Sequence, residues 1–200
     1  LQGALTERAI TTPVVLVGSG ERAQQYRHYT VQDEPLGEYA LASVTSEREG
    51  LYTSLSRVVA FDPPDWLADR TAAANRVEAT ALAATRAVGR EDGTAGEVFA
   101  AIQNAYAAVG YPGEWKEHHQ GGAAGYAGRE WFGTPENDAP VELPMAYAWN
   151  PTVQGAKSEG TVLVTEDGFE RLTEPGDWPT REVEAVGYDL TVERPAVFSC

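Results

Sequence analysis

The sequence predicts a single α+β domain. Residues 39–45 and 51–61 resemble two β-strands, and the charged turn Glu47-Arg48-Glu49-Gly50 between them predicts a β-hairpin. Residues 65–88 form an alanine-rich helical pattern, and a second helical pattern covers residues 95–109. After Pro112 the chain becomes irregular and rich in β-formers. This order of segments favours a mixed fold in which helices back an antiparallel sheet.

Local signals set the bounds of these elements. Residues 13–17 predict a short first strand, and residues 19–26 a polar helical turn behind it. The Pro63-Pro64 pair ends the second hairpin strand and starts the first long helix, which Gly89 ends. Thr94 and Glu97 have the spacing of a capping box at the start of the second long helix.

The second half of the chain contains further strand patterns. Residues 141–150 lead into a strand, residues 161–165 form another, and residues 169–172 follow a turn at 166–168. Residues 176–200 are expected to be a C-terminal extension, in which the weak alternation of residues 181–193 indicates a closing hairpin. We find no linker or repeat, so residues 1–200 are expected to be one domain.

The charge of the chain limits its partners. The formal net charge is −15, and Lys116 and Lys157 are the only lysines among 15 basic residues. Such a chain repels phosphate backbones, which argues against nucleic acid as a partner. The acidic, lysine-poor composition is typical of proteins from a high-salt cytoplasm, although a mildly acidic mesophilic enzyme is the alternative.

Cysteine content and hydropathy indicate the compartment. Cys200 is the single cysteine, which excludes a disulfide within the chain and a cysteine-based metal site. We identify no apolar run of membrane-spanning length and no signal-peptide pattern, so no membrane partner is expected and the location is predicted to be cytoplasmic. The first residue is Leu1 rather than Met, which suggests a trimmed chain.

The segment "EHHQGGAAGY", residues 117–126, contains two of the three histidines. Side chains alternate along an extended segment, so only one of His118 and His119 would face a pocket, and we expect His118 to do so. The glycines that follow allow a close approach of the backbone to a ligand. A glycine-rich surface turn is the alternative.

Three segments resemble the pita-bread family of methionine aminopeptidase, prolidase, Xaa-Pro aminopeptidase and creatinase. They are "ALASVTSEREGLYTSLSRV", "HHQGGAAGYAGRE" and "AYAWNPTVQGAKSEGTVLVTEDGFERLT", within a match from about Pro13 to Thr173. The resemblance implies a pseudo-twofold fold with a curved antiparallel sheet backed by helices. It also implies a homodimer and a chain that is N-terminally truncated relative to the family.

The family's peptidases bind two metal ions, and the resemblance places their five ligands on this sequence. The two aspartates fall on Ser43 and Ser54, and the histidine falls on Gly122. The two glutamates fall on Asn150 and Glu159. A single carboxylate cannot hold a catalytic divalent ion, so we expect neither a metal site nor another cofactor.

The remaining polar residues of the family's pocket suggest metal-free chemistry. Creatinase-like members hydrolyse C–N bonds without metal, which implies catalytic roles for His28, His118 and Glu159, with a histidine as the general base. The candidates for binding a small polar substrate are His119, Tyr126, Arg129, Glu130, Asn150, Ser43, Ser54 and Trp115. For each of these a structural role is the alternative; Glu159, for example, could be a buried carboxylate neutralised by Lys157 or Arg57.

Three functions therefore stay open. The first is metal-independent hydrolysis of an amide or amidine-type C–N bond in a small polar compound. The second is a catalytically inactive binding module with the same fold. The third is a dinuclear-metal Xaa-Pro aminopeptidase, against which the missing ligands argue.

Overall fold

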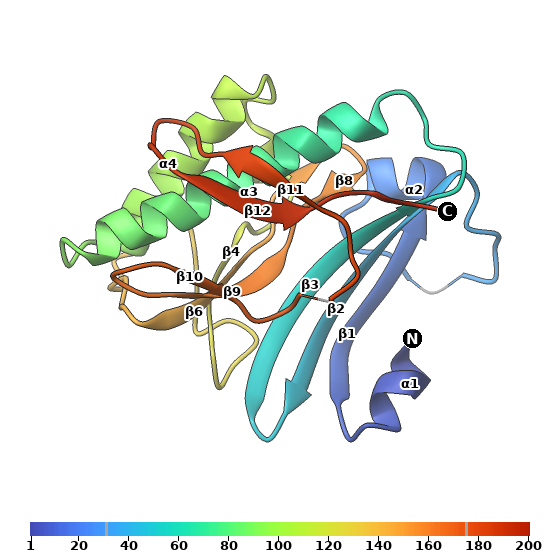
Figure 1. Cartoon of the computed structure of the whole chain (residues 1–200), viewed down its shortest axis with the longest axis horizontal. Coiled ribbons are helices and arrows are strands. Elements are labelled where there is room, and N and C mark those ends of the chain that lie inside the picture. Colours follow the sequence, from blue (N-terminus) through green and yellow to red (C-terminus); the bar gives the residue numbers. More distant parts are fainter. Residues whose placement is uncertain (31, 175) are drawn as a thin grey trace.

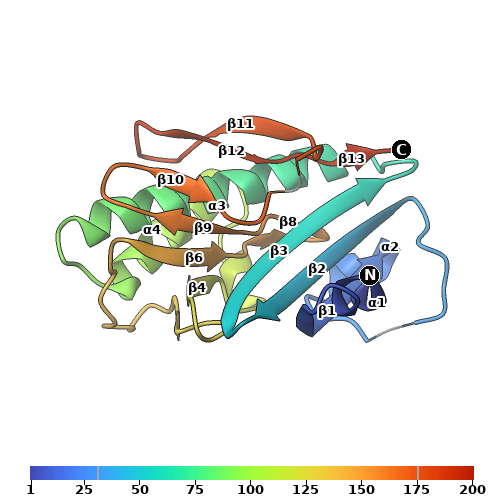
Figure 2. The same ribbon diagram turned by 60° about the horizontal axis from the view of Figure 1, so that its bottom comes forward.

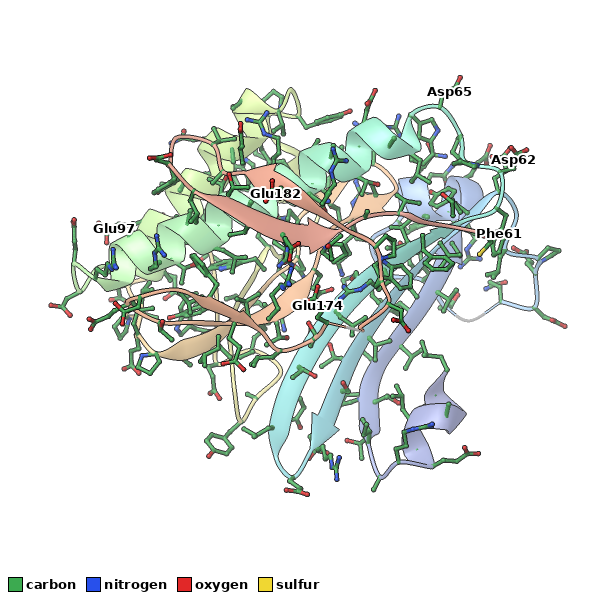
Figure 3. The ribbon with its side chains drawn as sticks, in the orientation of Figure 1. Phe61, Asp62, Asp65, Glu97, Glu174 and Glu182 are labelled. Carbon is green, nitrogen blue, oxygen red and sulfur yellow. The ribbon has the colours of Figure 1, made fainter. Side chains whose placement is uncertain are left out.

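The computed structural model describes residues 1–30, 32–174 and 176–200. Two antiparallel sheets lie side by side, and two long helices cover the second sheet (Figure 1). None of the helices in these described ranges combines the length and the hydropathy needed to cross a membrane. Acidic side chains such as Asp62, Asp65 and Glu182 are exposed to solvent (Figure 3), in keeping with the net charge.

The first sheet is built on the predicted hairpin. Strands β1 (Thr11–Ser19), β2 (Tyr39–Arg48) and β3 (Leu51–Ala60) are antiparallel neighbours in that order. Glu49 and Gly50 connect β2 to β3 with φ values of 55° and 85°, as a two-residue hairpin loop of the primed type requires. The Glu47 carboxylate accepts a hydrogen bond of 2.7 Å from the Gly50 amide, which stabilises the turn.

The second sheet has the strand order β10-β9-β6-β4-β5. Its strands are β4 (Gly121–Ala124), β5 (Trp131–Phe132), β6 (Met145–Trp149), β9 (Gly160–Val164) and β10 (Phe169–Arg171). The small pair β7 (Thr152–Val153) and β8 (Ala156–Lys157) lies between β6 and β9 in sequence. A bridge between Ser56 and Glu159 joins the two sheets, so polar residues of β3 meet the start of β9.

Helices α3 (Leu67–Gly89) and α4 (Ala95–Ala108) agree with the two predicted helices. The capping box between Thr94 and Glu97 is present at the start of α4. Alanines on α3 allow close packing against α4 and the second sheet. The main core between them includes Val77, Leu82, Val98, Ile102, Tyr106, Tyr147, Trp149 and Val162.

The C-terminal segment covers the other side of α3. Strands β11 (Thr180–Glu184) and β12 (Thr191–Pro195) form an antiparallel hairpin where the sequence indicates one. The hairpin lies over α3 in both ribbon views (Figures 1 and 2), and Val183 packs against Ala79 and Ala83. Helix α3 is therefore enclosed on two sides, and even its Glu78 has no exposed surface.

Two elements differ from the sequence-based expectations. The residues before the first strand include a short helix, α1 (Gln2–Thr6), whose described residues are not buried. Strand β13 (Phe198–Ser199) pairs with β3 in parallel, although the rest of that sheet is antiparallel. Helix α2 (Gly20–Gln25) agrees with the predicted turn behind β1, and η1 (Glu114–Lys116) is a single 3-10 turn.

Candidate functional site

A cavity of about 360 Å³ lies where β1 and β2 face the ends of β6 and β9. Three of the five positions implied as metal ligands line it, namely Ser43, Asn150 and Glu159. The described residues that line the cavity do not include Ser54 or Gly122. Ser54 is nevertheless connected to it, because its Oγ accepts a hydrogen bond of 3.0 Å from Arg129, which lines the cavity.

The Glu159 carboxylate is buried and paired at both oxygens. Its Oε1 lies 3.0 Å from Arg129 Nη2, and its Oε2 lies 2.9 Å from Lys157 Nζ. Ser56 Oγ donates a third hydrogen bond of 2.6 Å to Oε2. Burial by itself raises the pKa of Glu159, but Lys157 and Arg129 lower that pKa to about 2. Glu159 is therefore ionised at neutral pH.

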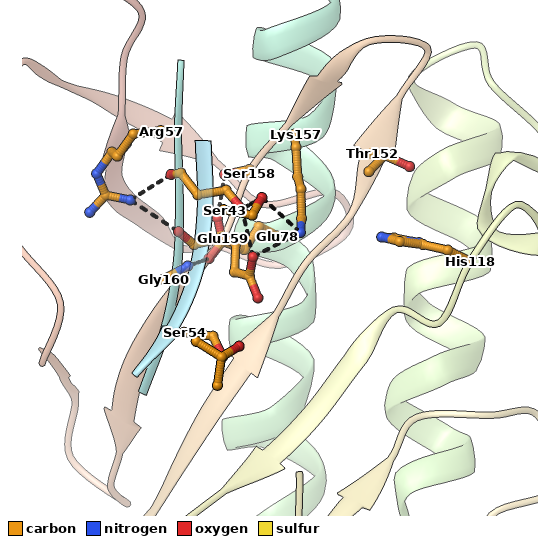
Figure 4. A network of polar contacts seen from close by, with 12 residues as sticks. Ser43, Ser54, Arg57, Glu78, His118, Thr152, Lys157, Ser158, Glu159 and Gly160 are labelled. Carbon is orange, nitrogen blue, oxygen red and sulfur yellow. Dashed lines mark hydrogen bonds and ion pairs between the residues drawn. The ribbon is translucent and has the colours of Figure 1, made fainter. Parts of the chain in front are cut away.

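Two cationic side chains lie among the positions that the resemblance implies as metal ligands. Lys157 Nζ contacts Ser43 Oγ at 3.4 Å as well as Glu159 (Figure 4). Arg129 contacts Ser54 Oγ and Glu159. Each cation thus connects a serine at a ligand position with the one remaining carboxylate.

These residues do not fit a dinuclear metal centre. A divalent ion at Glu159 would have to displace or repel Lys157 and Arg129, and the hydroxyls of Ser43 and Ser54 are weak replacements for carboxylates. A histidine could not replace Gly122 either, because a Cβ there would lie 2.1 Å from the Trp131 carbonyl oxygen. In the described ranges no group of three histidine, cysteine, aspartate or glutamate side chains is arranged to hold a metal ion.

All three histidines gather beside the cavity. The ring centroid of His28 lies 6.2 Å from those of both His118 and His119. The rings of His118 and His119 stack, with centroids 5.3 Å apart. The convergence expected from the sequence is therefore present in the fold.

The expectation that His118 faces the cavity and His119 turns away was wrong. That expectation requires an extended segment, whereas residues 117 and 118 form a bend directly after η1, and the two rings lie on one side. His28 and His119 line the cavity, and His118 packs beside them. His118 Nδ1 lies 3.3 Å from Gln120 Nε2, and His118 Nε2 has no hydrogen-bond partner among the described residues.

The three imidazoles are neutral at physiological pH. Burial, followed by the charge of Lys157, lowers the pKa of His118 to about 2 and that of His28 below its ordinary value. Burial and the Arg129 guanidinium lower the pKa of His119 to about 4. Such rings can donate or accept hydrogen bonds, but they are weak bases.

The structure places three proposed substrate-binding residues away from the cavity. Tyr126 is 81% exposed, because it lies in the turn after β4 and points to solvent. The Glu130 carboxylate accepts hydrogen bonds from the Tyr126 and Ala127 amides, so it stabilises that turn. Trp115 packs edge-on against Phe99, with ring centroids 5.5 Å apart, at the margin of the main core.

Other residues have roles that the sequence reading did not assign. Arg129, a candidate for binding a substrate, also pairs with Glu159 through one terminal nitrogen. The reading missed Ser56, which bonds both Ser43 Oγ and Glu159. The available signal was the spacing of Ser54 and Ser56, since residues two apart on a strand share one face. Of the two cations suggested as partners of the Glu159 carboxylate, Lys157 pairs with it. Arg57 contacts the Glu159 carbonyl oxygen instead.

Comparison with solved structures decides the fold. A dipeptidase, PepE, from Mycobacterium ulcerans superposes with a TM-score of 0.67 at 26% sequence identity, covering 82% of this chain and 46% of that one. A prolidase from Thermococcus sibiricus gives a TM-score of 0.70 at 17% identity, covering 100% of this chain and 51% of that one. The chain has the pita-bread fold.

The pita-bread assignment confirms the predicted fold class and the resemblance read from the three segments. The N-terminal domain of FACT complex subunit SPT16 from Cicer arietinum also superposes, with a TM-score of 0.68 at 12% identity over 88% of this chain and 48% of that one. The chain therefore spans about half the length of the solved structures it matches. No protein-family model matches the sequence, and no curated protein sequence does.

Proposed function

We propose that this pita-bread domain binds a small polar molecule in the cavity beside Glu159 without the dinuclear metal chemistry of a peptidase. The observation that carries the proposal is the polar part of the cavity wall, which includes Asn150, Arg129 and Lys157. Lys157 Nζ contacts two acceptors, Ser43 Oγ and Glu159 Oε2, and therefore keeps a third hydrogen. A bound polar molecule would accept that hydrogen bond.

The catalytic carboxylate expected from the sequence is committed to internal contacts. Glu159 accepts hydrogen bonds from Lys157, Arg129 and Ser56, which leaves it poorly placed to activate water. The neighbouring histidines have lowered pKa values and are weak general bases. Binding therefore fits this arrangement better than hydrolysis does. The SPT16 domain, named as part of a complex subunit, is an example of the fold in an assembly component.

A fragment screen followed by amide-resonance NMR in the presence of a chelator tests the proposal. We expect at least one polar fragment to shift the resonances of residues around the cavity. The Asn150→Leu variant should lower the affinity for that fragment about tenfold, because a polar side chain of the cavity wall is replaced by an apolar one. Asn104→Leu, the same change at an exposed position on α4, is the matched control. A screen in which fragments shift only residues remote from the cavity would overturn the proposal.

Metal-independent hydrolysis of a C–N bond is the second candidate. Its specific support is that His28 and His119 line the cavity as neutral rings, the form that can accept a proton. If the chain is such a hydrolase, it should hydrolyse a fragment that contains an amide or amidine group while the chelator is present. The rate of hydrolysis should fall in the His119→Phe variant. Binding without any conversion by the wild-type chain would exclude hydrolysis and retain the binding proposal.

A further inference from the structure

The polar end of the cavity has a net positive charge in a strongly acidic chain. Lys157 and Arg129 contribute two positive charges there and Glu159 one negative charge, while the histidines are neutral. The chain as a whole has a formal net charge of −15. Lys157 is also one of only two lysines, and its side chain is only 9% exposed. An excess buried cation is costly unless an anion pairs with it.

The two cations retain free donors. The ammonium group of Lys157 has three hydrogens and contacts two acceptors, Ser43 Oγ and Glu159 Oε2. In Arg129, Nη1 donates to Ser54 Oγ and to the Gly128 carbonyl oxygen, whereas Nη2 donates only one of its two hydrogens, to Glu159 Oε1. The third hydrogen of Lys157 Nζ and the second hydrogen of Arg129 Nη2 are thus left for a ligand, which matches the two oxygens of a carboxylate.

Part of the cavity wall is apolar. Val14, Leu16, Val44 and Phe132 line it together with Tyr52. Val14 is 38% exposed and Phe132 is 43% exposed, so these side chains offer uncovered apolar surface at the cavity wall. A ligand with a hydrocarbon or aromatic body would cover this surface and gain the hydrophobic contribution of its burial.

We propose that the ligand is a small monocarboxylate with an apolar body, whose carboxylate pairs with Lys157 and Arg129 in place of the metal ions of the fold's peptidases. This inference rests on the proposed binding function and specifies its ligand class. One negative charge neutralises the excess positive charge. A dianion such as a phosphate would leave the pocket negative inside an acidic chain, and an amine would add a third cation.

Four probes with the same body test the inference: phenylacetate, phenylacetamide, phenethylamine and phenylphosphate. Affinities are measured on the wild-type chain by calorimetry, and the binding place is located by amide-resonance NMR. We expect phenylacetate to bind at the cavity at least tenfold tighter than phenylacetamide, because hydrogen bonds to a charged acceptor are stronger. Phenethylamine and phenylphosphate should bind more weakly than phenylacetate.

A variant pair identifies the cation. In Lys157→Met the advantage of phenylacetate over phenylacetamide should fall about tenfold, because the carboxylate loses an ion pair and the amide loses only a hydrogen bond to a neutral acceptor. Lys116→Met removes the other, exposed lysine and should change neither affinity. The comparison of phenylacetate with phenylacetamide uses the wild-type chain alone. The carboxylate inference is therefore tested even if the Lys157→Met variant does not fold.

The outcomes separate this inference from the proposed function. Equal affinities for the acid and the amide at the cavity would overturn the carboxylate inference and leave small-molecule binding standing. Tighter binding of phenylphosphate, or no binding of phenylacetate, would also overturn it. The proposed function itself is tested by the wider fragment screen. It would fail if no polar fragment of any charge bound at the cavity.

Discussion

Arg194 Nε lies 2.9 Å from Glu78 Oε2, and both side chains are almost completely shielded from solvent. The pair joins the C-terminal hairpin to the middle of α3. Glu78 also accepts hydrogen bonds from Ser158 Oγ and from the Gly160 amide at 3.0 Å. Those two residues flank Glu159, so the ion pair connects the hairpin to the segment that carries the buried carboxylate of the cavity.

Arg194→Met should lower the free energy of unfolding by about 3–5 kcal/mol, because it leaves the Glu78 carboxylate buried without its charge partner. Burial already raises the pKa of Glu78. Urea denaturation followed by circular dichroism measures the loss. Arg181→Met, at an exposed position of the same hairpin, should change stability by less than about 0.5 kcal/mol. Equal effects of the two substitutions would contradict a role for the pair.

The depressed pKa of Glu159 predicts an acid-dependent stability. The folded pKa of about 2 lies below the ordinary value of 4.5, so the unfolded chain binds a proton first as the pH falls. The contribution of Glu159 is complete above pH 4.5 and is lost toward pH 2, with a total of roughly 3 kcal/mol. Glu159→Gln should be less stable than wild type at pH 7. The difference should shrink between pH 4.5 and 2 in denaturation curves, and a constant difference would refute the assignment.

His118 should remain neutral across the physiological range. Burial and the charge of Lys157 lower its folded pKa to about 2, against an ordinary value of 6.5. A lowered folded pKa means that the stability contributed by the neutral ring is complete above pH 6.5 and declines as the pH falls below that value. In an NMR titration the ring resonances of His118 should not shift between pH 8 and about pH 5. A midpoint near 6.5 in the folded chain would show that the ring is not buried as described.

Gly122→Ala should strongly destabilise the fold. The residue has a φ of 156°, and a Cβ would lie 2.1 Å from the Trp131 carbonyl oxygen, across the β4–β5 pair. Relief requires the strands to separate, at a cost of about 3 kcal/mol. Gly168→Ala is the control, since no described atom lies within 4 Å of a Cβ there. Thermal unfolding of the two variants should differ by many degrees, and similar midpoints would contradict the prediction.

Metal exposure tests the assignment of the lost ligand positions. After incubation with Mn²⁺, Co²⁺ or Zn²⁺ and desalting, elemental analysis should find well below one ion per chain, because Lys157 and Arg129 compete for Glu159. Lys157→Met/Arg129→Met frees the carboxylate, but it still lacks the three or so protein ligands of a tight site, so the ion content should stay low. Two tightly bound ions in the wild-type chain would overturn the assignment of ligand positions.

The sequence by itself determined the elements and the family resemblance. The Glu49-Gly50 turn, the prolines before α3 and the Thr94–Glu97 box act within a few residues, so local rules place the hairpin and both helices. The loss of metal ligands at Ser43, Ser54 and Asn150 was also readable, because it depends only on residue identity at matched positions.

Only the tertiary structure decided how the polar residues are paired. Arg129 reaches Glu159 and Ser54 from a turn 30 and 75 residues away in sequence, and Glu78 meets Arg194 across 116 residues. The bend at residues 117 and 118, which puts His118 and His119 on one side, depends on how η1 packs rather than on the alternation of side chains along a strand. Charged groups and aromatic rings interact with the groups that lie near them in the folded structure. The number of residues between two positions in the sequence does not give the distance between them in space.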